Sequence, residues 1–183
     1  MPQHSQRVAL VTGATSGIGL ATARLLATQG HQVFIGARTA DSVAETVKQL
    51  TDEGLDVDGT TLDVRSAESV AAFVARAVER FGTVDVLVNN AGRSGGGVTA
   101  DLEDELWDDV IDTNLNSVFR MTREVLNTGG MRTKDRGRII SIASTAGKQG
   151  VVLGAPYSAS KHGVVGFTKA LGNELAPTGI TVN

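Results

Sequence analysis

The chain has 183 residues, of which 41% are hydrophobic, and its 17 basic and 20 acidic residues give a formal net charge of −3. This balance provides no overall attraction to nucleic acid or to an anionic membrane, and the length suits one domain with a substantial core. Because the chain has no cysteine and only three scattered histidines, we expect neither disulfides nor a metal site. No apolar stretch approaches the ~18 residues that span a bilayer, so we expect a cytoplasmic protein.

Apolar strand candidates alternate with amphipathic helix candidates, which favours parallel strands joined by helical crossovers. Gly30, Gly54 and Gly82 stand where helices are expected to end. Residues 1–183 are therefore predicted to form one α/β domain, a Rossmann-like doubly wound parallel sheet with helices on both faces. The predicted strands lie near residues 7–12, 32–37, 57–63, 84–89, 137–143 and 179–183.

Two further segments carry structural expectations. The basic, glycine-containing stretch 129–137 reads as a solvated loop. Trp107 lies on a predicted helix with Leu106 and Val110, and we expect it in the core or at an interface rather than as a ligand platform.

A glycine-rich turn follows the first predicted strand and precedes the first predicted helix. Glycines let the backbone turn tightly and approach a diphosphate, and the N–H groups at a helix start favour anions. The strand-to-helix setting favours a dinucleotide site over a merely tight turn. The candidate cofactor residues in this turn are Thr12, Gly13, Thr15, Ser16, Gly17, Ile18 and Gly19.

The end of the second predicted strand indicates which dinucleotide is bound. Enzymes that bind NAD usually place a carboxylate there, against the ribose 2′-hydroxyl. Residues 33–38 contain no carboxylate and end in Arg38, which could pair with a 2′-phosphate. This favours NADPH, and the alternative is an ordinary surface arginine.

A candidate proton donor lies in a Tyr-x-x-x-Lys pattern formed by Tyr157 and Lys161. On a helix this spacing puts a phenol and an ammonium on one face, and a nearby cation favours the phenolate, which makes the phenol a usable acid or base. Alone the pattern is weak, because an aromatic ring lying over a long lysine side chain gives the same spacing. His162 points away from its predecessor on the helix, so we assign it no catalysis.

Further motifs accompany this pair: Asn89-Asn90-Ala91-Gly92 at the end of a predicted strand, a lone Asn114, and Ser144 just after another strand. Together with the glycine turn and Tyr157 to Lys161, they make the chain resemble the short-chain dehydrogenase/reductase family from about Arg7 to the last residue. The resemblance implies an oxidoreductase whose catalytic residues are Asn114, Ser144, Tyr157 and Lys161.

The resemblance also implies individual roles. Tyr157 would give the proton, Ser144 would orient the carbonyl, and Lys161 would bind the nicotinamide ribose. Asn114 would hold a water that relays protons to Lys161. Further cofactor contacts would come from Asp63, Val64, Asn90, Ala91, Gly92, Tyr157 and Lys161. Without the resemblance, Asp63 is as readily a helix cap or loop residue, and Ser144 a strand-end cap.

Within the family, the chain is most similar to the ketoreductases of bacterial aromatic polyketide biosynthesis, on residues 89–97, 148–152 and 155–170. This implies reduction of a carrier-protein-bound polyketide with NADPH, by a homotetramer that binds neither nucleic acid nor membrane. The alternatives are a 3-oxoacyl-carrier-protein reductase, a dehydrogenase of a small secondary alcohol, and a nucleotide-binding scaffold without turnover.

Three expectations concern the substrate side. The glycine run 95–97 is either a border of the substrate cleft or a flexible loop. Arg38, Arg65 and Arg93 each follow a predicted strand end and could attract an acidic carrier protein, or lie scattered in solvent. Family members normally continue beyond the position of Asn183 with a substrate-covering segment, so we expect the chain to be a fragment or incompletely given.

Overall fold

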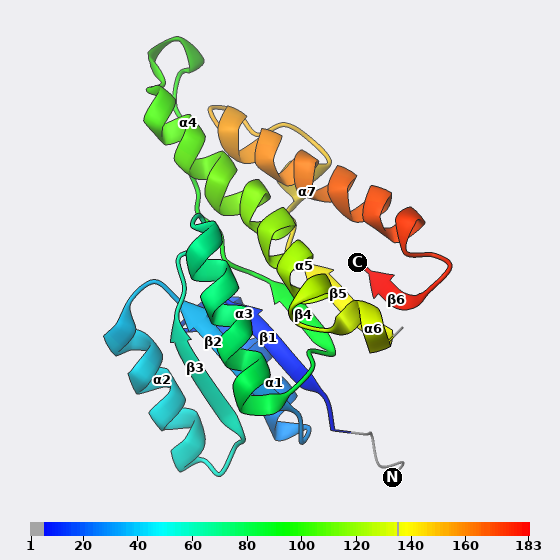
Figure 1. Cartoon of the computed structure of the whole chain (residues 1–183). Coiled ribbons are helices and arrows are strands. Elements are labelled where there is room, and N and C mark those ends of the chain that lie inside the picture. Colours follow the sequence, from blue (N-terminus) through cyan, green and yellow to red (C-terminus); the bar gives the residue numbers. More distant parts are fainter. Residues whose placement is uncertain (1–5, 135) are drawn as a thin grey trace.

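Six strands form one parallel sheet in the computed structural model, which describes residues 6–134 and 136–183 (Figure 1). Their spatial order is β3-β2-β1-β4-β5-β6. All five residues of β1 are buried, as expected for a central parallel strand that is covered on both faces. The strands are β1 (Val8–Thr12), β2 (Gln32–Ala37), β3 (Val57–Thr61), β4 (Val86–Asn89), β5 (Arg136–Ser141) and β6 (Gly179–Val182).

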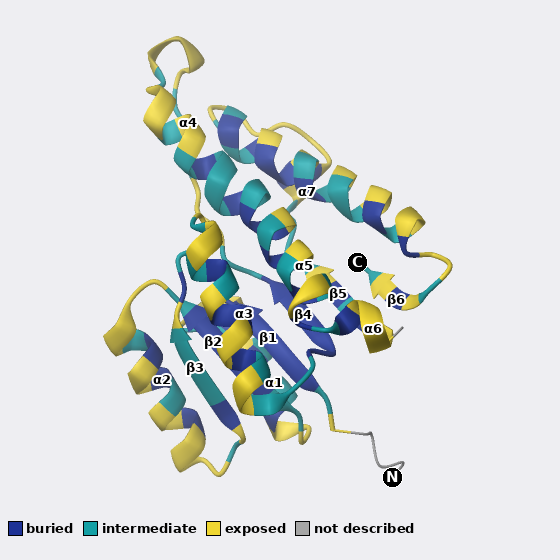
Figure 2. Ribbon diagram, in the orientation of Figure 1, coloured by how far each residue is buried: buried dark blue, intermediate teal, exposed yellow. Residues whose placement is uncertain are grey.

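The helices cover the sheet in two layers, each with its own core cluster. On one face, Ala23 of α1 and Leu50 of α2 pack with Val33 and Ile35. On the other face, α3, α5 and α7 pack over the sheet, and Phe73 is fully buried there. Figure 2 shows the central strands β1, β2 and β4 as largely buried, while the edge strands β3 and β6 are partly exposed. The helices are α1 (Gly17–Thr28), α2 (Ala40–Asp52), α3 (Ala67–Phe81), α4 (Asp104–Ile111), α5 (Ser117–Asn127), α6 (Met131–Lys134) and α7 (Ala155–Glu174).

The predicted fold class is confirmed, and each predicted strand coincides with an observed one to within two residues at either end. The three glycines expected at helix ends lie there with left-handed backbones, at φ 86° for Gly30, 79° for Gly54 and 84° for Gly82. Local signals worked well for α1, α2 and α3, because each of these helices has a core-facing pattern and a glycine just after its end.

The interpretation of residues 129–137 as a solvated loop is wrong in part. Gly130, at φ 72°, turns the chain into the short helix α6, and Met131 is fully buried. Gly137 is also buried, and it lies so close to Met131 that a side chain at this position would collide with it. The basic residues around Met131 concealed its core position in the sequence pattern. Residue 135 lies outside the described part of the chain. Trp107 is 41% exposed, which excludes the core position for it, and the interface position stays a prediction.

A long helical rod and α7 carry the side chains that matter most for the site. α4, the π-helical turn η2 (Asp112–Asn116) and α5 follow one another without a break, since the joining residues keep helical dihedrals. α7 runs beside this rod (Figure 1). At Gly163 of α7, a Cβ would lie 2.6 Å from Leu115, so the glycine allows the two helices to approach closely.

Candidate active site

The two loops that build the site meet where the strand order reverses. From β1 the sheet extends to β2 and β3 on one side and to β4 on the other, and such a switch point opens a crevice at the carboxyl ends of the strands. There the Asn90 side chain donates hydrogen bonds to the main-chain oxygens of Thr12 and Gly13, each at 3.0 Å. The glycine turn after β1 and the Asn-Ala-Gly segment after β4 therefore form one unit.

Thr12 holds the segment after β4 in place through its side chain. Its side chain is buried, and Oγ1 accepts hydrogen bonds from the N–H groups of Asn90 at 3.0 Å and Ala91 at 2.9 Å. The sequence interpretation treated Thr12 as a cofactor contact, whereas the structure places it behind the cleft, where it orients the residues that line it.

We expect Thr12→Val to loosen both loops, because it leaves two partly buried N–H groups without their acceptor, and each such loss costs at most about 1–3 kcal/mol. Thr12→Ser keeps the hydroxyl and is the matched control. Urea unfolding should show a clear decrease in the free energy of unfolding for the valine variant and a small decrease for the serine variant. Equal stability of the two variants would contradict the bracing role.

The glycine turn has the geometry of an anion cradle. Gly13 and Gly17 have left-handed backbones, at φ 63° and 53°. A side chain at Gly19 would collide with the Gly13 carbonyl and lie 2.5 Å from the Asn90 amide, so only glycine permits this close packing. Ser16, at the start of α1, makes no capping hydrogen bond, which leaves first-turn N–H groups of the helix for an anion.

A cavity of about 430 Å³ lies over this turn, within the size range of ligand pockets. It brings together most of the predicted cofactor residues, while Thr12, Gly19, Tyr157 and Lys161 lie outside its lining. The lining residues are Gly13, Thr15, Ser16, Gly17, Ile18, Ala37, Arg38, Thr39, Leu62, Asp63, Val64, Arg65, Asn90, Ala91, Gly92, Arg93 and Thr113.

The cavity rim carries three arginines in two different states. Arg38 is exposed, and among the described residues no hydrogen bond or ion pair holds its guanidinium. Arg65, by contrast, donates to both carboxylate oxygens of Asp63, the shortest of these contacts being 2.7 Å. This hydrogen bond from Arg65 is the main reason that the pKa of Asp63 lies below its ordinary value. Val64 beside it is buried.

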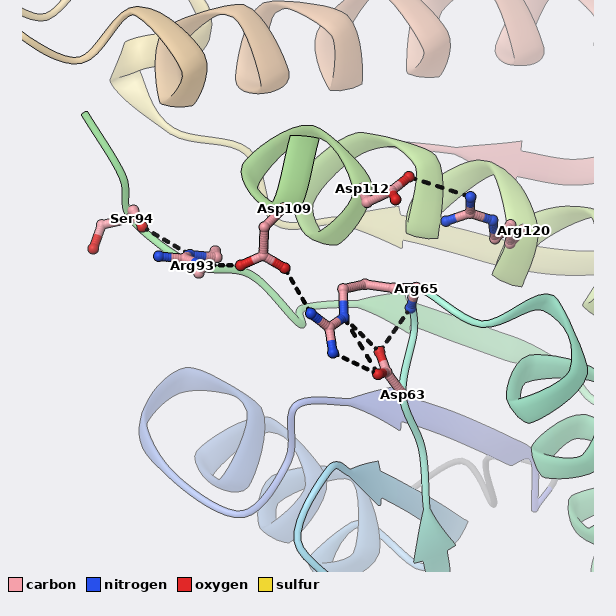
Figure 3. A network of polar contacts seen from close by, with 7 residues as sticks. All are labelled: Asp63, Arg65, Arg93, Ser94, Asp109, Asp112 and Arg120. Atoms are coloured by element: carbon pink, nitrogen blue, oxygen red, sulfur yellow. Dashed lines mark hydrogen bonds and ion pairs between the residues drawn. The ribbon is translucent and has the colours of Figure 1, made fainter. Parts of the chain in front are cut away.

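Asp109 of α4 links the other two arginines, as Figure 3 shows. One carboxylate oxygen accepts from Arg65 Nη1 at 2.7 Å, and the other accepts from Arg93 Nη1. Of the two alternatives, a shared rim or a scattered set, Arg65 and Arg93 show the shared rim, but both already have carboxylate partners. The two cations are largely neutralised, which weakens the expectation that they draw in an acidic partner.

The two residues of the proton-donor pattern lie on one face of α7. Lys161 Nζ is 5.9 Å from the centre of the Tyr157 ring and donates to the Ile142 carbonyl at 2.7 Å. Lys161 is only 6% exposed, and this burial lowers the pKa of its ammonium. A Cβ on Gly92 would lie 3.8 Å from Lys161 Nζ, so the lysine reaches the end of the cofactor cavity.

Asn114 fastens three elements together from the π-helical turn. Its Oδ1 accepts from the Arg93 N–H at 2.8 Å, and its Nδ2 donates to the Arg93 carbonyl at 2.9 Å and to Ser160 Oγ at 3.1 Å. The side chain is 1% exposed and its two N–H groups are both used. A water-holding role for Asn114 stays a prediction. Such π-helical turns are frequent at functional sites.

Ser144 lies at the start of the short helix η3 (Thr145–Gly147), which packs on α7. Its Oγ accepts a hydrogen bond from the Ala146 N–H at 3.2 Å, so the capping role considered for it is present. Because Oγ is the acceptor in that bond, its own proton remains to be donated to a carbonyl oxygen. A Cβ on Gly147 would lie 2.7 Å from the Lys161 carbonyl, which fixes η3 against α7.

The glycine run 95–97 is fastened to the loop before α7. Gly97 N–H donates to the Leu153 carbonyl at 2.8 Å, and a side chain at Gly96 would collide with the same carbonyl. Leu153 has φ 58°, a strained value for a residue other than glycine. These contacts favour a fixed border over the alternative of a flexible loop.

Sequence reasoning missed Asp109, Thr113 and Ser160. Asp109 and Thr113 lie on a helical rod whose approach to the cleft no local pattern reveals. Ser160 stands inside the Tyr-x-x-x-Lys pattern, and its spacing from Tyr157 was the one available signal. His162 has Nδ1 2.9 Å from the Ser158 carbonyl, and the structure adds nothing to suggest catalysis by it.

The family model described as short chain dehydrogenase matches residues 7–183. A relative from Streptomyces virginiae, named as a ketoacyl reductase of a monensin polyketide synthase, is 79% identical over all of this chain and 70% of its own length. A relative from Streptomyces violaceoruber, named as ketoacyl reductase 1 of a granaticin polyketide synthase, is 69% identical over 96% of this chain and 65% of its own.

Among solved structures, that of the F189W actinorhodin polyketide ketoreductase with NADPH superposes with a TM-score of 0.95 and 63% identity, over 97% of this chain and 68% of that one. The chain thus spans about two thirds of the length of the proteins that it matches. Within residues 6–134 and 136–183, no helix is both long and apolar enough to cross a membrane, and no cluster of side chains could hold a metal ion.

Proposed function

This chain belongs to the short-chain dehydrogenase family, and we propose that it is an NADPH-dependent ketoreductase that reduces a keto group of a carrier-protein-bound polyketide to a secondary alcohol. The observation that carries the proposal is the placement of Tyr157 and Lys161 together on α7, with the lysine at the end of the dinucleotide cavity. The names of the 79% and 69% identical relatives support the choice of substrate class.

The residues of the cavity fit NADPH. The cradle of Gly13, Gly17 and Gly19 would hold the diphosphate against the start of α1, and Arg38 would pair with the 2′-phosphate. Asp63 and Val64 would border the adenine end, and Asn90, Ala91 and Gly92 would border the nicotinamide end, since all five line the cavity. Bound NADPH supplies a hydride to the ketone carbon.

Side chains of the protein then stabilise and neutralise the negative charge that develops on the ketone oxygen. Tyr157 gives its phenol proton to that oxygen as negative charge develops there, and the Ser144 hydroxyl donates a hydrogen bond to the same atom. Lys161 places a positive charge beside the phenol, which favours proton release. Asn114 holds α7 and the segment after β4 in register, so that these groups meet the substrate together.

A substrate panel tests the proposal. NADPH oxidation should be fastest with fused-ring ketones and β-ketoacyl thioesters, and slow with small acyclic ketones. A preference for simple β-ketoacyl thioesters would favour the 3-oxoacyl-carrier-protein reductase, and a preference for small ketones would favour the alcohol dehydrogenase. Tight NADPH binding without turnover on any ketone would favour the scaffold and overturn the proposal.

Docking of the carrier protein gives a separate prediction, motivated by the bridging of Arg65 and Arg93 by Asp109. Asp109→Asn removes the shared carboxylate and leaves the rim more positive, so reduction of a carrier-bound substrate should quicken roughly 2- to 10-fold at low salt. Reduction of a free ketone should stay unchanged. Asp108→Asn, an exposed neighbour on the same helix, is the control.

Stopped-flow rates at several salt concentrations would measure the effect. An equal change with both substrates would place the carrier elsewhere and leave Arg65 and Arg93 as structural residues.

We further propose that the protein is a homotetramer, packed through the α4 to α5 rod. Trp107 and Phe119 on that rod are 41% and 48% exposed, which leaves apolar surface on it for a partner subunit. Sedimentation equilibrium would measure the assembly. A cytoplasmic location also remains a proposal.

A further inference from the structure

We propose that Ser160 is a positioning residue for the reaction, which transmits the placement of Asn114 to the turn of α7 that carries Tyr157. The inference rests on the proposed function for its consequence in catalysis, whereas the physical link stands on the hydrogen bonds alone. Ser160 is the residue immediately before Lys161, and its side chain is fully buried.

The link is a chain of two hydrogen bonds. Ser160 Oγ accepts from Asn114 Nδ2 at 3.1 Å and donates to the Tyr157 carbonyl at 2.7 Å. A hydroxyl has one proton to donate and accepts through its lone pairs, so both contacts can exist at once and each fixes the direction of the other. In a buried setting such connected bonds polarise and stiffen one another.

The far end of the link is equally constrained. Asn114 is held by both the N–H and the carbonyl of Arg93, at 2.8 and 2.9 Å. Arg93 directly follows Gly92, which lines the cofactor cavity and lies next to Lys161 Nζ. The link therefore runs from the wall of the cofactor cavity, through Asn114 and Ser160, to the main chain of the proton donor.

Helix packing alone does not set this placement with the same accuracy. Gly163 lies against Leu115 and Gly147 lies against the Lys161 carbonyl, contacts that fix how closely α7 approaches its neighbours. Such close contacts limit how far the helices approach, whereas they constrain sliding along the helix axis less directly. A directional hydrogen bond at Ser160 resists the sliding, and displacements of about 1 Å are enough to cost a large part of a reaction rate.

Ser158 provides a matched control on the same helix. It is also buried, at 8% exposure, and its Oγ accepts a hydrogen bond from the Val151 N–H at 3.1 Å. It has no hydrogen bond to Asn114 among the described residues. Ser158→Ala thus removes a buried serine hydroxyl from α7 without touching the link.

The experiment has a kinetic arm. Ser160→Ala should lower kcat roughly 10- to 100-fold, while KM for the ketone and the Kd for NADPH, measured by fluorescence, stay within about twofold. Ser160→Thr, which keeps the hydroxyl, should recover most of kcat. Ser158→Ala should keep kcat even if it lowers the unfolding temperature as much as Ser160→Ala does. If Ser160→Ala does not fold, Ser160→Cys takes its place, because it keeps the volume and weakens both bonds.

A second arm needs no activity. The free energy of unfolding would be measured for Ser160→Ala, Asn114→Ala and the double variant. The double variant should lose less stability than the two single variants combined, because each single variant already breaks the shared link. Additive losses would overturn the link. Equal kcat losses at Ser158 and Ser160, or an unchanged kcat for Ser160→Ala, would overturn the positioning role. If the unaltered protein reduces no ketone, the proposed function fails, and the unfolding cycle still decides whether the link exists.

Discussion

Replacing Tyr157 with Phe is expected to reduce ketone reduction by at least ~10²-fold, the usual effect of losing a general acid. The ring remains beside Lys161, but no proton is available for the ketone oxygen. Among the described residues, nothing hydrogen-bonds to the phenol hydroxyl, so its removal should leave folding nearly unchanged. Steady-state kinetics, together with NADPH binding by fluorescence and a melting curve, would separate chemistry from folding.

The control for this experiment is the retained binding of NADPH, since Tyr157 lies outside the cofactor cavity. A fall in turnover with intact binding and melting identifies a role in the chemical step. Turnover at the level of the unaltered protein would remove Tyr157 from the mechanism and would require another acid in the cleft.

The second large effect is expected at Arg38. Arg38→Asp should weaken NADPH binding about 10- to 100-fold while changing NADH binding little, because it replaces the partner of the 2′-phosphate with a repelling charge. Arg38 is suited to this role because it lines the cavity and has no hydrogen bond or ion pair to another described residue that would first have to break. Titration with each cofactor would give the two dissociation constants.

Two variants sharpen that measurement. Arg38→Gln removes the cation without adding an anion, and its loss should lie between those of the unaltered protein and Arg38→Asp. Arg76→Asp makes the same charge change at an exposed site on α3, away from the dinucleotide cavity, and should not alter the cofactor preference. An NADPH-to-NADH preference that stays constant in Arg38→Asp would show that the 2′-phosphate is bound elsewhere.

The fold was predictable because its signals are local. β1 is buried throughout and apolar up to its last residue, α3 shows one buried stripe, and Gly82 ends that helix with the backbone that only glycine adopts readily. The cofactor turn was predictable for the same reason, since a strand, a glycine run and a helix follow one another directly. Met131 was not, because one apolar side chain among basic neighbours carries no period.

The connections inside the site were beyond local reasoning. Asn114 bonds to residues 21 and 46 positions away, and Thr12 bonds to a loop 78 positions away. Such partners depend on how helices cross and where the sheet reverses. The same holds for Asp109, which pairs with two arginines that the sequence alone presents as free. The sequence thus provided the candidate groups, and the fold determined which of the charged ones already have partners.

The π-helical turn at residues 112–116 also makes the site sensitive to chain length. Each residue in a helix advances the direction of its side chain by about 100°. Adding or removing one residue between α4 and α5 would therefore swing the Asn114 amide away from Arg93 and Ser160, or turn Val110 out of the core. The number of residues in the rod therefore fixes the direction of the Asn114 side chain. Substitutions on the outer surface of the rod leave that direction unchanged, whereas an insertion or deletion of one residue does not.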